Sequence, residues 1–194
     1  MAPRTKKVSR WTPFGPGLIS LAALLLPLAA AAQSPPPLQH QAYVWQRAWT
    51  GPVRAAVAQH ATNFDSLVAL AAEVSWRGGQ PALARVPLDY AALAAAKTRA
   101  GLALRIGPWP GPFATNDSTA NFLTSLAAAL VEEAKAKGVV PSELQIDFDC
   151  AASKLDGYRV WVQAIRRKVA PTPVAVTWIW KLPLGAGAGW PAWV

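Results

Sequence analysis

The sequence contains 194 residues, of which 53% are hydrophobic and 15% are charged, and its formal net charge is +9. The basic residues are scattered and form no stripe with interleaved aromatic residues, so nucleic acid is not an expected partner. The single cysteine, Cys150, excludes an intramolecular disulfide. A hydrophobic core must therefore hold the fold together without covalent cross-links.

Residues 1–33 have the layout of a secretory signal peptide. A basic start is followed by an apolar run over residues 18–32 that ends in four alanines. The run is shorter than the roughly 20 residues of a membrane span, so we expect cleavage near Ala32, with an uncleaved anchor as the alternative. The protein is therefore expected to be exported to the periplasm or the extracellular space. We expect no other contact with a membrane.

A proline-rich linker over residues 34–40 leads into alternating strands and helices. The predicted strands are Gln41–Trp49, Ser66–Trp76, Leu102–Trp109, Glu143–Cys150 and Val174–Trp180. The predicted helices are Pro52–Ala61, Tyr90–Ala100, Ser118–Lys137 and a last one that ends at Val169. Their expected N-caps are Thr50, Asp89, Asp117 and Ser153, the last in a capping box with Asp156. Residues 77–81 are rich in glycine and predict a loop.

Two α/β architectures fit this alternation. A five-stranded doubly wound parallel sheet would be complete in the roughly 160 residues that follow the signal peptide. A (β/α)8 barrel needs about 250 residues, so residues 41–182 would form an incomplete barrel with about five strands and four helices. Residues 183–194, rich in glycine and tryptophan, would then be an irregular tail of a truncated or frameshifted chain.

Charged residues favour the barrel. They recur on one face of the predicted strands and toward the C-terminal ends, at Arg47, Glu73, Arg105, Asp147 and Asp149. A doubly wound sheet is covered by helices on both faces and has little room for such charges, whereas the interior of a barrel accepts polar layers near its active-site end.

The segment Glu143–Cys150 is the most informative stretch of the chain. Leu144, Ile146 and Phe148 alternate with Gln145, Asp147 and Asp149. The alternation predicts a strand with two carboxylates on one face, about 6.5 to 7 Å apart along the strand.

Three segments together resemble an uncharacterised bacterial family, the domain of unknown function family 3142. They are Tyr43–Arg47, Ala72–Val74 and Leu144–Cys150, the last followed by Leu155, Tyr158, Ile165 and Arg166. The resemblance covers residues 41–177, the N-terminal portion of a longer family pattern, and implies a fold related to TIM-barrel glycosidases. It implies no particular activity.

The Asp147–Asp149 strand also resembles the chitinase family, in which such a strand continues to a glutamate that acts as the general acid. That position is Ala151 in this sequence, and alanine cannot donate a proton. The chitinase mechanism therefore does not carry over to this strand.

Several residues are candidates for a carbohydrate site. The candidate catalytic residues are Asp147, Asp149 and Glu73, because glycoside hydrolysis usually uses two carboxylates. The candidate substrate-binding residues are Arg47, Arg105, Trp45, Trp76 and Trp109, because sugar rings stack on indole faces. The alternative is that the arginines and carboxylates form structural ion pairs without chemistry. Cys150 is expected to be a buried thiol rather than a nucleophile.

The sequence thus predicts an exported protein that binds or hydrolyses carbohydrate, with any enzymatic activity being of the glycoside hydrolase type. No cofactor and no metal ion are expected. A non-catalytic glycan-binding or scaffolding barrel, or a truncated product without function, remain as alternatives.

Overall fold

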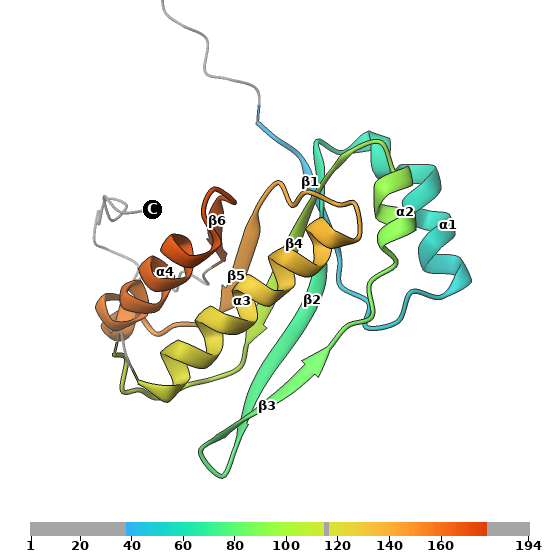
Figure 1. Cartoon of the computed structure of the whole chain (residues 1–194). Helices are drawn as coiled ribbons and strands as arrows, with labels where there is room; N and C mark the ends of the chain where they lie inside the picture. The colour runs from blue at the N-terminus through green and yellow to red at the C-terminus, as the bar shows by residue number, and fades with distance from the viewer. Residues whose placement is uncertain (1–37, 115–116, 178–194) are drawn as a thin grey trace, which may run out of the picture. The chain divides into compact units, whose positions relative to one another are not determined.

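The computed structural model describes residues 38–114 and 117–177 of the chain. Five parallel strands form a curled sheet in the order β1-β2-β4-β5-β6, and β3 pairs antiparallel with β2 (Figure 1). The strands are β1 Gln41–Val44, β2 Ser66–Arg77, β3 Gln80–Arg85, β4 Arg99–Ile106, β5 Leu144–Phe148 and β6 Val174–Thr177. The α-helices are α1 Gly51–His60, α2 Tyr90–Ala95, α3 Ser118–Ala136 and α4 Leu155–Val169. Two short 3-10 turns are η2 Ala61–Asn63 and η3 Ala152–Lys154.

The order of the parallel strands identifies the architecture. The strands lie in the sheet in the order in which the chain makes them, without the reversal of direction that defines a doubly wound sheet. Because crossovers between parallel strands are right-handed, a sheet that grows in one direction carries its connecting helices on one face. The described residues therefore form a half-barrel, which confirms the predicted incomplete barrel over the doubly wound alternative.

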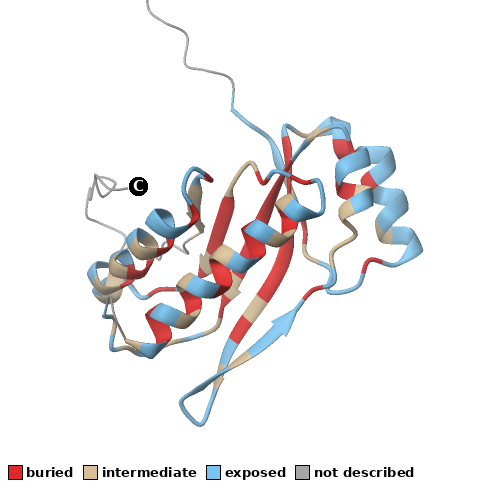
Figure 2. Cartoon of the chain, viewed as in Figure 1, coloured by how far each residue is buried: buried red, intermediate tan, exposed pale blue. Residues whose placement is uncertain are grey.

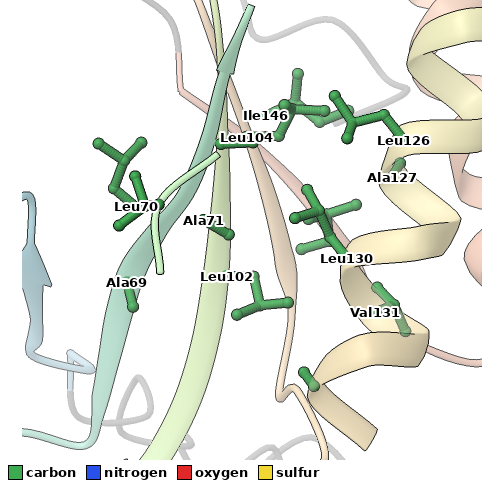
Figure 3. Packing of buried hydrophobic residues seen from close by; sticks show 14 of the residues in the cluster. Ala69, Leu70, Ala71, Leu102, Leu104, Leu126, Ala127, Leu130, Val131 and Ile146 are labelled. Carbon is green, nitrogen blue, oxygen red and sulfur yellow. The ribbon is translucent and has the colours of Figure 1, made fainter. Parts of the chain in front are cut away.

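The face of the sheet that meets α3 and α4 is apolar. Leu102, Leu104 and Ile146 are fully buried and point toward Leu126 and Leu130 of α3 (Figure 3). Figure 2 shows β4, β5 and the sheet-facing side of α3 as one buried layer. Burying a leucine or isoleucine side chain stabilises a fold by about 1.5–3 kcal/mol, so this layer is the main source of stability.

Helices α3 and α4 largely follow the predicted pattern. Asp117 caps α3, since its Oδ1 accepts a hydrogen bond from the Ala120 amide at 2.6 Å. Gly138 ends this helix region with a φ of +83°. Helix α4 buries an apolar stripe that consists of Tyr158, Trp161, Ile165 and Val169.

The predicted capping box before α4 is wrong. The η3 turn occupies this segment, and α4 begins after Lys154 without a side-chain cap. The spacing between Ser153 and Asp156 suggests a reciprocal pair of hydrogen bonds. The 3-10 turn instead supplies the first backbone hydrogen bond, from the Lys154 amide to the Ala151 carbonyl at 2.8 Å.

Residues 77–81, predicted as a loop, belong to a β-hairpin. Strand β2 runs on to Arg77, and β3 returns antiparallel to it. Gly78 and Gly79 form the turn with φ values of +56° and +78°, the left-handed conformations that a two-residue hairpin of this kind needs. Pro81 argues against a strand, but β3 is paired with β2 alone among the described strands, and an edge strand tolerates proline.

The second helix is shorter than predicted. Asp89 caps α2 as expected, with Oδ1 accepting from the Ala92 amide at 2.9 Å, but the helix ends at Ala95. Lys97 then adopts a φ of +54°, and β4 begins at Arg99. The alanine-rich run favours helix by propensity, and Gly101 is the expected helix stop. Parallel pairing of Arg99–Ile106 with β2 overrides that propensity.

Some predicted segments are longer than the strands in the structure or include residues that it does not describe. Strand β1 ends at Val44, so Trp45 to Trp49 of the first predicted strand lie outside it. Residues 1–33, Trp178 to Trp180 and the tail 183–194 lie outside the described residues. In the ranges 38–114 and 117–177, no helix has the length and apolar character needed to cross a membrane.

Candidate functional site

A row of polar side chains crosses the sheet near the C-terminal ends of four strands. Glu73 of β2 is in register with Arg105 of β4, Arg105 with Asp147 of β5, and Asp147 with Thr177 of β6. Residues in register on neighbouring strands point to the same face. This face is opposite to the one covered by α3 and α4, because the alternating neighbours Leu104 and Ile146 pack against α3.

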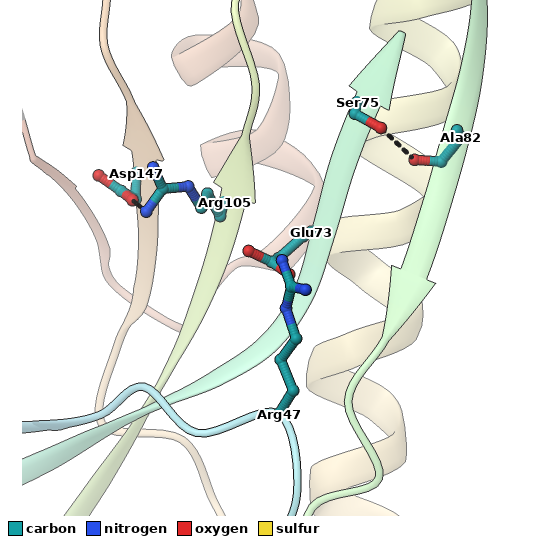
Figure 4. A network of polar contacts seen from close by, with 6 residues as sticks. All are labelled: Arg47, Glu73, Ser75, Ala82, Arg105 and Asp147. Atoms are coloured by element: carbon teal, nitrogen blue, oxygen red, sulfur yellow. Dashed lines mark hydrogen bonds and ion pairs between the residues drawn. The ribbon is translucent and has the colours of Figure 1, made fainter. Parts of the chain in front are cut away.

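Two ion pairs, whose residues are drawn in Figure 4, and a hydrogen bond from Thr177 hold these side chains. Arg47, which follows β1, pairs through Nε with the Glu73 carboxylate. Nη1 of Arg105 lies 3.6 Å from Oδ2 of Asp147, and Thr177 donates a hydrogen bond from Oγ1 to Oδ1 of Asp147 at 2.6 Å. The hydrogen bond that Arg47 donates to Glu73, together with the negative charge of Glu73, raises the pKa of Arg47. Arg47 therefore stays a cation at any physiological pH.

An aromatic pair flanks this polar row. The guanidinium carbon of Arg105 lies 5.8 Å from the centroid of the Trp45 ring, within cation–π distance. Tyr43 meets Trp45 edge to face at 5.8 Å, and 48% of its surface is exposed. The site thus combines a partly exposed indole, a phenol, two guanidinium groups and two carboxylates; we call these residues, with Thr177, the polar row site.

The spacing of Glu73 and Asp147 is informative about chemistry. One strand, β4, lies between their strands, so their backbones are separated by two strand spacings of about 4.8 Å each. That separation falls near the upper limit for the two carboxylates of an inverting glycosidase, about 6.5–9.5 Å. Arg105 stands between them, however, and each carboxylate already has a guanidinium partner. The arrangement suits the binding of hydroxyl-rich molecules better than proton transfer to them.

Asp149 lies apart from the row. Strand β5 ends at Phe148, and the Cys150 amide donates to the Phe148 carbonyl at 2.8 Å, which places Asp149 at the centre of a tight turn. The strand alternation that puts Asp147 and Asp149 on one face therefore stops before Asp149. Its exposed side chain lines a separate cavity of about 240 Å³, together with Trp109 and Lys154.

Trp76 and Trp109 belong to an aromatic cluster against α4. Their rings are 4.3 Å apart, and Trp109 also lies 6.4 Å from the buried Trp161. Phe113 packs against Trp161 with the ring centroids 4.6 Å apart and the planes tilted by 54°, and Nε1 of Trp109 donates to the Pro112 carbonyl at 3.0 Å. Trp76 follows Glu73 by three residues on β2, so the two side chains point to opposite faces and Trp76 points to the helix side of the sheet. The structure therefore separates these two tryptophans from Trp45.

Cys150 is buried beside this cavity, as expected for a structural thiol. Only 7% of its surface is exposed, and burial raises the pKa of the thiol although the charge of Lys154 opposes that rise. A raised pKa keeps the group protonated and poorly nucleophilic. Within residues 38–114 and 117–177, no group of three His, Cys, Asp or Glu side chains has the arrangement to hold a metal ion.

Sequence reasoning missed two members of the polar row site. The sequence places Tyr43 in a predicted strand but does not indicate a role for it in a site. Neither the residue type nor the spacing of Thr177 indicates such a role either. The alternation of Val174–Thr177 could show that Thr177 shares a face with Ala175, but not which face. Only the register with Asp147 brings the Thr177 hydroxyl into the site.

Comparisons with known proteins give similar structures but no family. The fold is similar to the crystal structure of a chitinase from Chromobacterium violaceum, at 18% identity and a TM-score of 0.48, over 72% of this chain and 45% of that one. It is also similar to the spore cortex-lytic enzyme SleL of Bacillus cereus, at 15% identity and a TM-score of 0.47, over 73% of this chain and 35% of that one.

The chain thus spans less than half the length of either solved structure. No family model matches the sequence, and no curated protein matches it. The resemblance to domain of unknown function family 3142 therefore stays a prediction. Structural similarity at such low identity does not transfer function from these enzymes to this chain.

Proposed function

We propose that the protein binds carbohydrate at the polar row site. The single observation that supports this proposal most is the position of Trp45 beside Arg105, in the middle of a row of hydrogen-bonding side chains. The row lies at the C-terminal ends of parallel strands, the end at which barrel folds carry their sites.

The chemistry of the row matches that of a sugar. A sugar ring presents apolar C–H faces that an indole ring can cover, and hydroxyl groups that both donate and accept hydrogen bonds. Arg47 and Arg105 supply donors in a fixed planar arrangement, whereas Glu73 and Asp147 supply acceptors. The side chain of Arg105 is 43% exposed and that of Asp147 is 20% exposed, so both can be reached from solvent.

Binding can be tested with cellohexaose, xylohexaose and chitohexaose as probes in isothermal titration calorimetry. Replacing Trp45 by alanine removes the stacking surface, which we expect to weaken binding of the preferred probe about tenfold or more, equal to about 1.4 kcal/mol. Arg105→Met should weaken it as well. Arg159→Met, on the exposed side of α4, is the matched control and should leave affinity unchanged.

Hydrolysis is a second candidate, and the exposed carboxylate of Asp149 favours it. Among the described residues, no ion-pair or hydrogen-bond partner occupies this side chain, and it lines a cavity with Trp109. If any probe is turned over, Asp149→Asn, Asp147→Asn and Glu73→Gln should be compared by kcat. A variant with an unchanged kcat removes its residue from the reaction.

We further propose that the protein is exported. The basic start, the short apolar run and the alanines before residue 33 support this. Expression with the native N-terminus, followed by N-terminal sequencing of the periplasmic fraction, should find a mature chain that starts near Gln33. Full-length protein confined to the cytoplasm would contradict export, and full-length protein in the membrane fraction would favour the uncleaved anchor.

A further inference from the structure

One buried polar group near the polar row site has no hydrogen-bond partner. Gln145 of β5 is only 6% exposed, and its Oε1 atom is buried without a donor among the described residues. Burying an amide oxygen in this way destabilises the fold compared with burying a paired one, because the hydrogen bonds to water are lost without replacement. Native proteins contain few such groups, and each one calls for an explanation in terms of function or binding.

The position of Gln145 connects it to the site. It precedes Asp147 by two residues on the same strand, so both side chains point to the same face, about 6.6 Å apart along the strand. Its neighbours in register are Ala103 on β4 and Ala175 on β6. Because both neighbours are alanines, neither of them offers a hydrogen-bonding side chain to the amide.

The contact between Arg105 and Asp147 above Gln145 is a weak one, although Thr177 holds Asp147 itself. The shortest contact between Arg105 and Asp147 is the 3.6 Å ion pair, which is too long for a hydrogen bond. The Arg105 side chain is also 43% exposed, and an ion pair that is open to solvent contributes little to stability. The guanidinium can therefore move away from Asp147 while it stays near Trp45, and a ligand group can then reach the amide beneath it.

We propose that Gln145 determines the specificity of the site by accepting a hydrogen bond through Oε1 from a hydroxyl group of the bound carbohydrate. This inference rests on the proposed function. It assigns Gln145 to the floor of the site and Asp147 with Arg105 to the layer above it. The ligand class that fits is a neutral, polyhydroxylated sugar that inserts one O–H donor between the strands β4 and β6, above β5.

The test is the Gln145→Met variant, titrated with cellohexaose, xylohexaose and chitohexaose alongside the wild-type protein. Methionine is unbranched and similar in size, but it lacks the amide. We expect about tenfold weaker binding of the preferred probe, and a urea midpoint that is unchanged or higher because an unpaired buried oxygen is removed. Gln163→Met, on the exposed face of α4, is the matched control and should change neither quantity.

The outcomes separate this inference from the proposed function. Absence of binding by the wild-type protein would overturn both. Binding by the wild type that Gln145→Met retains would overturn the role of Gln145 alone. If the variant does not fold, the side-chain amide resonance of Gln145 in the wild-type protein decides: it should shift on addition of the preferred probe, and an unshifted resonance would overturn the inference.

Discussion

At the scale of single residues, Arg105 organises the polar row site. It lies in register between Glu73 and Asp147 and faces the ring of Trp45. The alternation of polar and apolar residues predicts that Glu73, Arg105 and Asp147 share a face, and the sheet register agrees. Asp149 and Trp109 could not be placed in this way, because they lie beyond the residues at which β5 and β4 end.

The reactivity of Cys150 tests whether the segment next to Asp149 is buried as the structure shows. It is the single cysteine, it is buried, and burial raises the pKa of its thiol. We expect a thiol-specific reagent such as DTNB to modify the native protein slowly at pH 8 and the urea-unfolded protein rapidly. Rapid stoichiometric modification of the native protein would show that the thiol is exposed or activated.

The raised pKa of Tyr90 should make the free energy of unfolding depend on pH in the alkaline range. Burial first, and then its hydrogen bond to Glu133, raise the pKa of Tyr90 to about 12 from the ordinary value of 10.0. Because the folded state holds this proton more tightly than the unfolded state, the contribution to stability is complete below pH 10 and is lost as the pH rises toward 12.

The Tyr90→Phe variant isolates this effect. Urea unfolding should show that the free energy of unfolding of the wild-type protein declines across this alkaline window more steeply than that of the variant. Other groups that titrate there, such as lysines, affect both proteins equally. Parallel declines would show that the hydroxyl of Tyr90 has the same pKa in the folded and unfolded states.

At the scale of elements, the close contact between α4 and the aromatic cluster depends on Gly157. A Cβ atom at this position would lie 2.8 Å from Cδ2 and 2.9 Å from Cβ of Phe113. Since the contacts include Cβ of Phe113, a simple rotation of the ring cannot relieve them. The glycine therefore permits Phe113 to pack against Trp161.

Gly157→Ala should destabilise the protein for this reason. Overpacking costs about 1–3 kcal/mol, which exceeds the gain of about 1 kcal/mol from replacing glycine by alanine within a helix. Gly51→Ala, at the start of α1, is the control because a Cβ atom added there would have no neighbouring atom within 4 Å. Urea denaturation should show a loss of stability in the first variant and none in the second; equal stability of both would contradict the packing described for α4.

The elements that sequence reasoning recovered are those whose local and tertiary preferences agree. Helix α3 has a capping aspartate, a long apolar face and a terminal glycine, so every local feature indicates the same boundaries. Helix α2 and strand β4 meet in an alanine-rich run that favours helix locally but forms a strand next to β2. The β2–β3 hairpin was missed because Pro81 is acceptable only on an edge strand, and edge position is a property of the whole sheet.

At the scale of the whole molecule, the sequence supported the half-barrel through charges rather than through element count. Five strands and four helices are compatible with both a doubly wound sheet and an incomplete barrel. The recurrence of charges on one face at the strand ends favoured the barrel, and the sequential strand order β1-β2-β4-β5-β6 confirms it. That order also explains the site, because it brings one polar residue from each of four strands into a single row.

The central claim is that this row, with Trp45, binds carbohydrate. The most direct measurement is isothermal titration of the wild-type protein and of Trp45→Ala, Arg105→Met and Arg159→Met with cellohexaose, xylohexaose and chitohexaose. We predict that the wild type binds at least one probe, that the first two variants bind it about tenfold more weakly or worse, and that Arg159→Met binds it unchanged. Wild-type protein that is folded but binds none of the probes, or equal affinity in all four proteins, would contradict the claim.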